Sequence, residues 1–304
     1  MKLTLPKYTW EDLWSGDAES LLLVTSPTEL FVSGDVEVDL QHRGRGLEIR
    51  GGTLTLTGGG TLTLTNGRAT DAGGAVLIDQ GELVLDRTTL VLEKAHAHYA
   101  GGLYMLAGTI RVNSAALRAV QCTADLAGAG VSIWDGRVQV HQGAIEVVEC
   151  TTPWHAAGFV VFLGHVELDD GRIVATGCKS GHKGQSTSYG GGVVIGESFP
   201  GYMFGPRPTI GFRGDSRIEV TGCSSSAAVA VLFRRAVISS DGGGARVLAT
   251  GNVMWSNTVP NLQPSYIVVF RRCRGDSIHV DSHGNVSGGH ELLNRGFFAK
   301  GIAI

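Results

Sequence analysis

The sequence predicts an all-β fold, a right-handed parallel β-helix that winds as a single solenoid with about 28 residues and three strands per coil. Three observations lead to this prediction. Glycine is frequent and proline is rare, with 45 and 8 residues, and short runs of Val, Ile, Leu and Thr recur. Two different sequence markers repeat at the same interval. Apolar and polar residues alternate inside each repeat, as they do in strands with one buried face.

The first marker is a pair of small residues at the start of an apolar strand. It opens GGAVLI at Gly73, GGLYML at Gly101, AGVSIW at Ala129 and AGFVVF at Ala157, at steps of 28 residues. The second marker is the residue that closes another strand. It is Cys122, Cys150 and Cys178, and the same step leads back to Lys94 and Asn66. Because both markers share one period, we expect stacked coils with a continuous core.

Each coil has one predicted strand after the small pair, one after a glycine turn and one before the cysteine position. Inward-facing residues should form columns from coil to coil. One column contains Val84, Val112, Val140 and Leu168, and another contains Thr89, Leu117, Ile145 and Ile173. Later coils are longer, so residues 197–208 and 260–265 should leave the coil as loops. The predicted organisation is a cap with the first coil (1–44), the β-helix (45–290) and a C-terminal tail (291–304).

Both ends of a solenoid need a cover, because the end coils expose apolar core and unpaired strand edges. Residues Thr9 to Asp12 resemble the start of a short helical cap, whose apolar face would be Trp10, Leu13 and Trp14. The tail is apolar at Phe297, Phe298, Ile302 and Ile304. It either folds back over its own last coil in a monomer, which we favour, or meets its counterparts in a trimer.

Charge and cysteine content argue against several classes of protein. The net charge of -3 does not favour nucleic acid as a partner, since phosphate-binding surfaces are usually strongly basic. No run approaches the ~18 apolar residues of a membrane span and the start lacks a secretory signal, so we expect no membrane span and a cytoplasmic or virion location. The 5 cysteines contain no CxxC pair. We therefore predict free thiols, no metal site and no cofactor.

With these repeats the chain resembles the pectin-lyase-like superfamily of right-handed β-helices, and its GGA-type repeats are similar to polymorphic outer-membrane autotransporter passengers. The likeness covers roughly residues 45–280. It implies the fold but leaves function open, because this architecture includes polysaccharide lyases, hydrolases, tailspikes, adhesins and non-catalytic virion proteins. The NTD, DD, HG and RIK signatures of a polygalacturonase-like enzyme do not occur as a cluster.

Acids and arginines alternate directly after the first strand of successive coils. The predicted column is Asp79, Ala107, Asp135, Leu163, Glu197, Arg234 and Arg271. Asp135 and Glu197 would lie two coils apart, about 9.6 Å, near the ~6.5 to 9.5 Å of an inverting glycosidase pair. The column would be a catalytic site in which Arg234 and Arg271 hold an anionic sugar, and the neighbouring Arg235 and Arg272 would complete an anion site. The alternative is a row of solvated turn residues.

The corner that leads into the first strand is rich in histidine and aromatic residues. Its candidate ligand-binding residues are His98, Tyr99, Trp154, His155, His182 and Tyr189, with His96 nearby. Aromatic faces pack against apolar sugar faces, so this corner is a candidate glycan site. A metal held by imidazoles and a packed hydrophilic corner are the alternatives.

From these features we predict a non-enzymatic structural or recognition β-helix, virion-associated or otherwise microbial, that binds a glycan or a protein partner. The rival interpretation is a polysaccharide lyase or glycoside hydrolase that acts on an acidic polysaccharide. An enzyme should have a groove along the first-strand face with converging acids, whereas a structural protein should have an even surface there.

Overall fold

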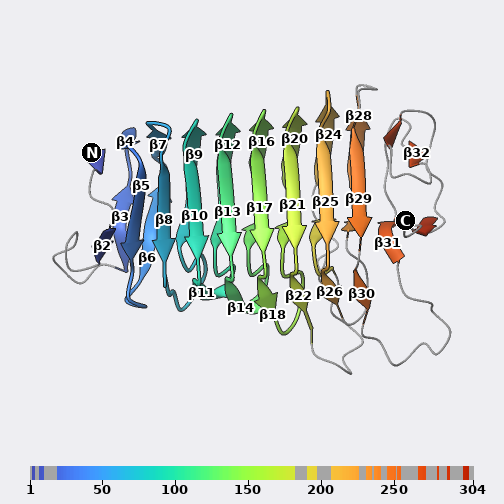
Figure 1. Cartoon of the computed structure of the whole chain (residues 1–304), viewed down its shortest axis with the longest axis horizontal. Coiled ribbons are helices and arrows are strands. Elements are labelled where there is room, and N and C mark those ends of the chain that lie inside the picture. Colours follow the sequence, from blue (N-terminus) through green and yellow to red (C-terminus); the bar gives the residue numbers. More distant parts are fainter. Residues whose placement is uncertain are drawn as a thin grey trace.

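The computed structural model describes thirteen segments of the chain. These are residues 2–3, 7–9, 19–181, 190–196, 207–225, 231–234, 236–240, 245–250, 252–254, 266–271, 279–280, 286–287 and 297–300. They form a parallel β-solenoid whose coils stand side by side along the long axis (Figure 1). This confirms the all-β class and the repeat of about 28 residues. For example, the coils that begin β17 and β21 pair Ala144 with Arg172, at a step of 28.

Four series of strands run along the solenoid. The first strands of successive coils are β3 (Ser20–Val24), β6 (Arg45–Arg50), β9 (Val76–Asp86), β12 (Leu103–Asn113), β15 (Val131–Ile133), β19 (Phe159–Val161), β23 (Val193–Gly196), β27 (Val231–Arg234) and β31 (Tyr266–Arg271). The second strands are β1 (Lys2–Leu3), β4 (Thr28–Val32), β7 (Thr53–Thr57), the later halves of β9 and β12, β16 (Arg137–His141), β20 (His165–Asp169), β24 (Thr209–Arg213) and β28 (Val237–Ser240).

The third strands are β2 (Lys7–Thr9), β5 (Asp35–Asp39), β8 (Thr61–Thr65), β10 (Thr89–Glu93), β13 (Ala116–Val120), β17 (Ala144–Val148), β21 (Arg172–Thr176), β25 (Arg217–Thr221) and β29 (Arg246–Thr250). Short strands form at the corner: β11 (His96–Tyr99), β14 (Thr123–Ala127), β18 (Thr151–Thr152), β22 (Lys179–Ser180), β26 (Ser224–Ser225) and β30 (Val253–Met254). The three predicted strands are all present. Because β9 and β12 continue from the first strand into the second, these two series share one sheet, and the corner strands form a third.

The core is a single column of apolar side chains inside the coils. Two predicted inward columns hold from Val112 to Leu168 and from Leu117 to Ile173, but their first members are wrong. Leu85 and Leu90 face the core instead of Val84 and Thr89. The reason is that the coil between Thr89 and Ala116 has 27 residues. A one-residue difference moves a side chain to the other face of a strand.

The cysteine column lies at a buried corner, and four of its residues are free thiols: Cys122, Cys150, Cys178 and Cys223. Asn252 occupies the same place in the next coil, where its Oδ1 accepts a hydrogen bond of 2.8 Å from the Cys223 backbone N–H. The predicted upstream members are one residue off for the same reason as above. Asn66 has a positive φ of 58° and donates to Asp39.

The two ends of the solenoid are covered by strands. Thr9, the predicted helix cap, is the last residue of β2, which pairs with β5, while Trp10, Leu13 and Trp14 lie outside the described residues. At the C-terminal end β34 (Phe297–Lys300) pairs antiparallel with β31, beside the small hairpin β32 (His279–Val280) and β33 (Val286–Ser287). The predicted fold-back is thus confirmed for residues 297–300. Whether the protein is a monomer stays a prediction.

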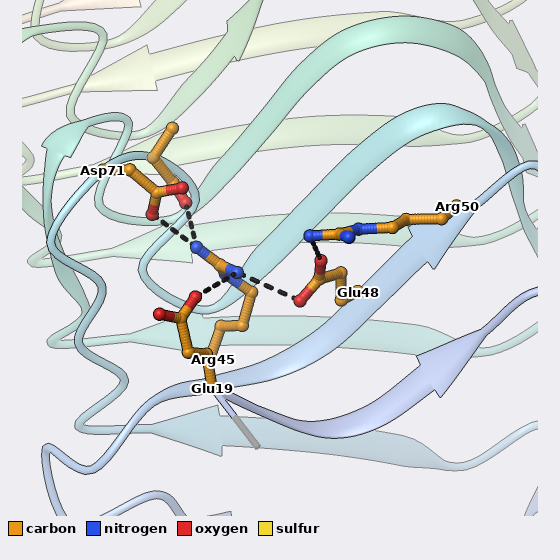
Figure 2. A network of polar contacts seen from close by, with 6 residues as sticks. Glu19, Arg45, Glu48, Arg50 and Asp71 are labelled. Carbon is orange, nitrogen blue, oxygen red and sulfur yellow. Dashed lines mark hydrogen bonds and ion pairs between the residues drawn. The ribbon is translucent and has the colours of Figure 1, made fainter. Parts of the chain in front are cut away.

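A network of ion pairs joins the first coils (Figure 2). Arg45 begins β6 and is 1% exposed. Its guanidinium lies 3.0 Å from Glu48 and 3.8 Å from Glu19 and pairs with Asp71, while Arg50 pairs with Glu48. Glu19 precedes β3 and Asp71 precedes β9, so one buried cation connects three successive coils.

Candidate functional site

The outward side of the first strands is lined by residues that are largely buried. Adjacent coils align Tyr104 with Ser132, Val160 and Val194. The corner folds over this column, which explains the small-residue marker. A Cβ on Gly128 would lie 2.3 Å from Ser132 Oγ, too close for any side chain. Val160 and Val194 form an apolar cluster apart from the core.

At the edge of this column, histidine and tyrosine side chains gather around one carboxylate. The rings of His98 and Tyr99 meet edge to face at 4.9 Å, and Tyr99 lies 6.3 Å from Tyr104. Asp125, on the next coil, is 3.6 Å from His96 Nε2 and 3.7 Å from His98 Nδ1. Burial, followed by the charge of Tyr99, raises the pKa of Tyr104 to about 12. The Tyr104 hydroxyl therefore remains a hydrogen-bond donor at neutral pH.

Trp154 and His155 follow one coil further along the same corner, and the structure separates them. Trp154 is 42% exposed. His155 is buried and forms a bridge with Ala127, and burial lowers its pKa. The prediction that His155 contacts a ligand is therefore wrong for this conformation. We name the surface formed by His98, Tyr99, Tyr104, Asp125 and Trp154 the corner ridge.

The predicted catalytic column is brought together only in part. Asp135 is exposed and its Oδ1 accepts a hydrogen bond of 2.6 Å from the backbone N–H of Gly136. Arg234 and Arg271 lie opposite each other on β27 and β31, as predicted. However, Arg234 is aligned with Gly196, so its predicted alignment with Glu197 is wrong by one residue.

Several candidate residues cannot be placed in the site. Glu197, Arg235, Arg272, His182 and Tyr189 lie outside the described residues, as do the side chains of Arg234 and Arg271. Their proposed roles remain predictions. Within the described segments, no group of three or more His, Cys, Asp or Glu side chains is arranged to hold a metal ion.

Two surface depressions lie away from the first-strand face. One, of about 440 Å³, crosses the turns before the third strands. Arg172 and Arg217 line it together with Asp170, Asp215 and Glu219, so its acids outnumber its arginines. The other, of about 400 Å³, lies on the second strands.

The sequence interpretation missed Tyr104, Asp125 and the depression on the second strands. Tyr104 had a usable signal, because it lies between Leu103 and Met105, which face the core. The position of Asp125 beside His98 had none. An irregular register between β11 and β14 brings these two residues together.

Comparisons with models of protein families, with curated proteins and with solved structures gave no match for this chain. In the part of the chain that the structure describes, no helix has the length and apolar character needed to cross a membrane.

Proposed function

We propose that this chain is a non-catalytic recognition β-solenoid and that it binds a glycan across the corner ridge. The observation that carries the proposal is the placing of Tyr99 and exposed Trp154 around the Asp125 carboxylate, which lies 3.7 Å from His98. Aromatic faces pack against the apolar faces of sugars, while a carboxylate accepts hydrogen bonds from their hydroxyl groups. The ridge thus offers both kinds of contact that a sugar requires.

The scaffold supports recognition rather than conformational change. Successive coils are joined by continuous parallel ladders, and the ridge residues lie on or beside the short corner strands β11, β14 and β18. Side chains held on such a ladder stay at fixed spacings of about 4.8 Å from coil to coil. A rigid surface loses little conformational entropy when it binds a ligand.

The finer classification belongs to this proposal too. The resemblance to the pectin-lyase-like superfamily and to autotransporter passengers, and a microbial or virion-associated origin, agree with a solenoid that contacts glycans. A protein partner remains the other form of the same recognition role. No second function is favoured by a specific observation, because Asp135 is exposed and bonds to its own neighbour.

A glycan array, followed by calorimetry on the best ligand, tests the proposal. We expect Trp154→Ala to weaken binding at least about tenfold, the equivalent of about 1.4 kcal/mol. Phe31→Ala is a matched control, because Phe31 is also 42% exposed but lies on β4 in an early coil. Unchanged binding by the Trp154 variant would contradict the proposal.

The same ligands should be assayed for cleavage by the wild-type protein. We expect no new reducing ends and no unsaturated products. Turnover that disappears in Asp135→Asn and persists in Trp154→Ala would replace the recognition role with the lyase or hydrolase interpretation.

A further inference from the structure

A glycine interrupts the outward face of the second strands. Adjacent coils align Gln139, Glu167, Gly211 and Ser239 in one outward column. Each of the other three carries a polar side chain. At Gly211 the column has none, and this leaves a hollow between Glu167 and Ser239.

Neither backbone conformation nor packing requires this glycine. Gly211 is absent from the residues with positive φ. A Cβ at this position would meet only Ser239 Oγ, at 3.4 Å, which is an ordinary contact. By contrast, a Cβ on Gly171 would lie 2.5 Å from a backbone oxygen. A glycine inside a strand weakens it and often marks a place where a ligand approaches closely.

The hollow is the floor of the depression of about 400 Å³. Its polar walls are Arg137, His165, Glu167, Thr209, Arg213, Ser239 and Ser240. Arg213 lies 3.1 Å from Glu167. Glu167 also accepts a hydrogen bond of 3.2 Å from Gln139. Arg137 is exposed, and no ion pair joins it to another residue within the described segments.

The charges and donors around the hollow favour an anionic group. Two arginines face one carboxylate, and that carboxylate already interacts with Arg213. Guanidinium groups bind carboxylate and sulfate through paired hydrogen bonds. The hydroxyl of Ser239 adds a neutral donor on the far side of Gly211. Glu167 is suited to accept a hydrogen bond from a sugar hydroxyl beside the anionic group.

We propose that the hollow over Gly211 binds the carboxylate or sulfate of an acidic oligosaccharide, with Arg137 and Arg213 as its principal donors. An oligosaccharide fits better than a nucleic acid, because the hollow holds one anionic group and the whole chain has a net charge of -3. A continuous polyphosphate would be repelled by that charge. This site is independent of the corner ridge, which lies along the corner strands at the lower edge of Figure 1.

The key variant is Gly211→Val, which fills the hollow with a residue that favours strands. We expect it to keep or raise the melting temperature while it weakens acidic-sugar binding at least about tenfold. Val84→Thr is the matched control, since Val84 is an outward residue in the same column on β9. Arg137→Gln should weaken binding in the same direction as Gly211→Val.

The probes are an oligogalacturonate, a heparin hexasaccharide, a neutral maltohexaose and a single-stranded oligonucleotide, each measured by calorimetry with the full chain. We expect at least one acidic sugar to bind and the maltohexaose not to bind. The proposal is overturned if Gly211→Val binds like the wild type, if neither acidic sugar binds, if maltohexaose binds equally well, or if the oligonucleotide binds more tightly. Trp154→Ala should retain this binding, so failure of the corner ridge and failure of the hollow give different results.

Discussion

Arg45 and Arg137 each begin a strand, but the two arginines lie in opposite environments. Arg45 is 1% exposed and has Glu48, Glu19 and Asp71 within ion-pair distance (Figure 2). Arg137 is exposed, and within the described segments it has no ion pair. The difference separates charges that hold coils together from charges that remain available to a ligand.

The largest expected effect is on stability at the buried arginine. Arg45→Ala removes the cation that compensates the buried Glu48 carboxylate and should lower the free energy of unfolding by about 3 to 5 kcal/mol. Arg137→Ala should change it by no more than about 0.5 kcal/mol, as is usual for an exposed residue. Urea unfolding of both variants measures this difference. Equal losses would show that the two arginines have the same structural role.

The cysteine column extends the comparison to buried neutral groups. Burial is the largest cause that raises the pKa of Cys150, so its thiol stays protonated and unreactive. We expect Cys122, Cys150, Cys178 and Cys223 to resist a thiol reagent in the native protein. After denaturation without reductant, the titration should find about 5 thiols, the full cysteine content. A count of one or three would reveal disulfides and contradict the prediction.

Histidines at the corner should separate in the same way when the pH is lowered. Burial lowers the pKa of His155 from 6.5. The unfolded chain therefore binds a proton at this residue before the folded chain does, so the free energy of unfolding falls as the pH drops below about 6.5. The fall should be shallower in His155→Gln than in the wild type. His98→Gln, at an exposed position, is the control, and an equal change in both variants would contradict the assignment.

The smallest expected effect is on the titration of Tyr104. Its pKa is raised to about 12, from a usual value of 10.0, mainly by burial. The stability that its neutral hydroxyl contributes is present below pH 10.0 and is lost as the pH rises through about 12. Tyrosinate absorbance should show one late transition that Tyr104→Phe removes. A Tyr104→Phe profile that still contains this transition would assign it to another tyrosine.

Much of the solenoid could be predicted from residue patterns. The cysteine column and the strands that begin at Gly101, Ala129 and Ala157 lie where the period of 28 places them. Local alternation also gave the correct inward residues over most of the core, from Val112 to Leu168. These features depend only on neighbours along the chain and on a constant step between coils.

The candidate sites were harder to predict, because each depends on alignment between coils. The step from Ile78 to Met105 is 27 residues, and an irregularity between Met105 and Ala107 then aligns Asp79 with Ala107. The same kind of shift places Arg234 opposite Gly196. A repeat length cannot reveal where in a coil such a residue is gained or lost.

The sequence by itself determined the parallel β-solenoid, because a repeated alternation of apolar residues can be buried only by stacking coils. Tertiary structure decided which polar groups are buried in pairs, as Arg45 and Glu48 are, and which remain exposed, as Arg137 does. It also decided that the missing side chain of Gly211 leaves a hollow on the surface. The physical reason is that side-chain direction in a strand alternates with every residue, so contacts between coils depend on a register that the sequence period does not specify.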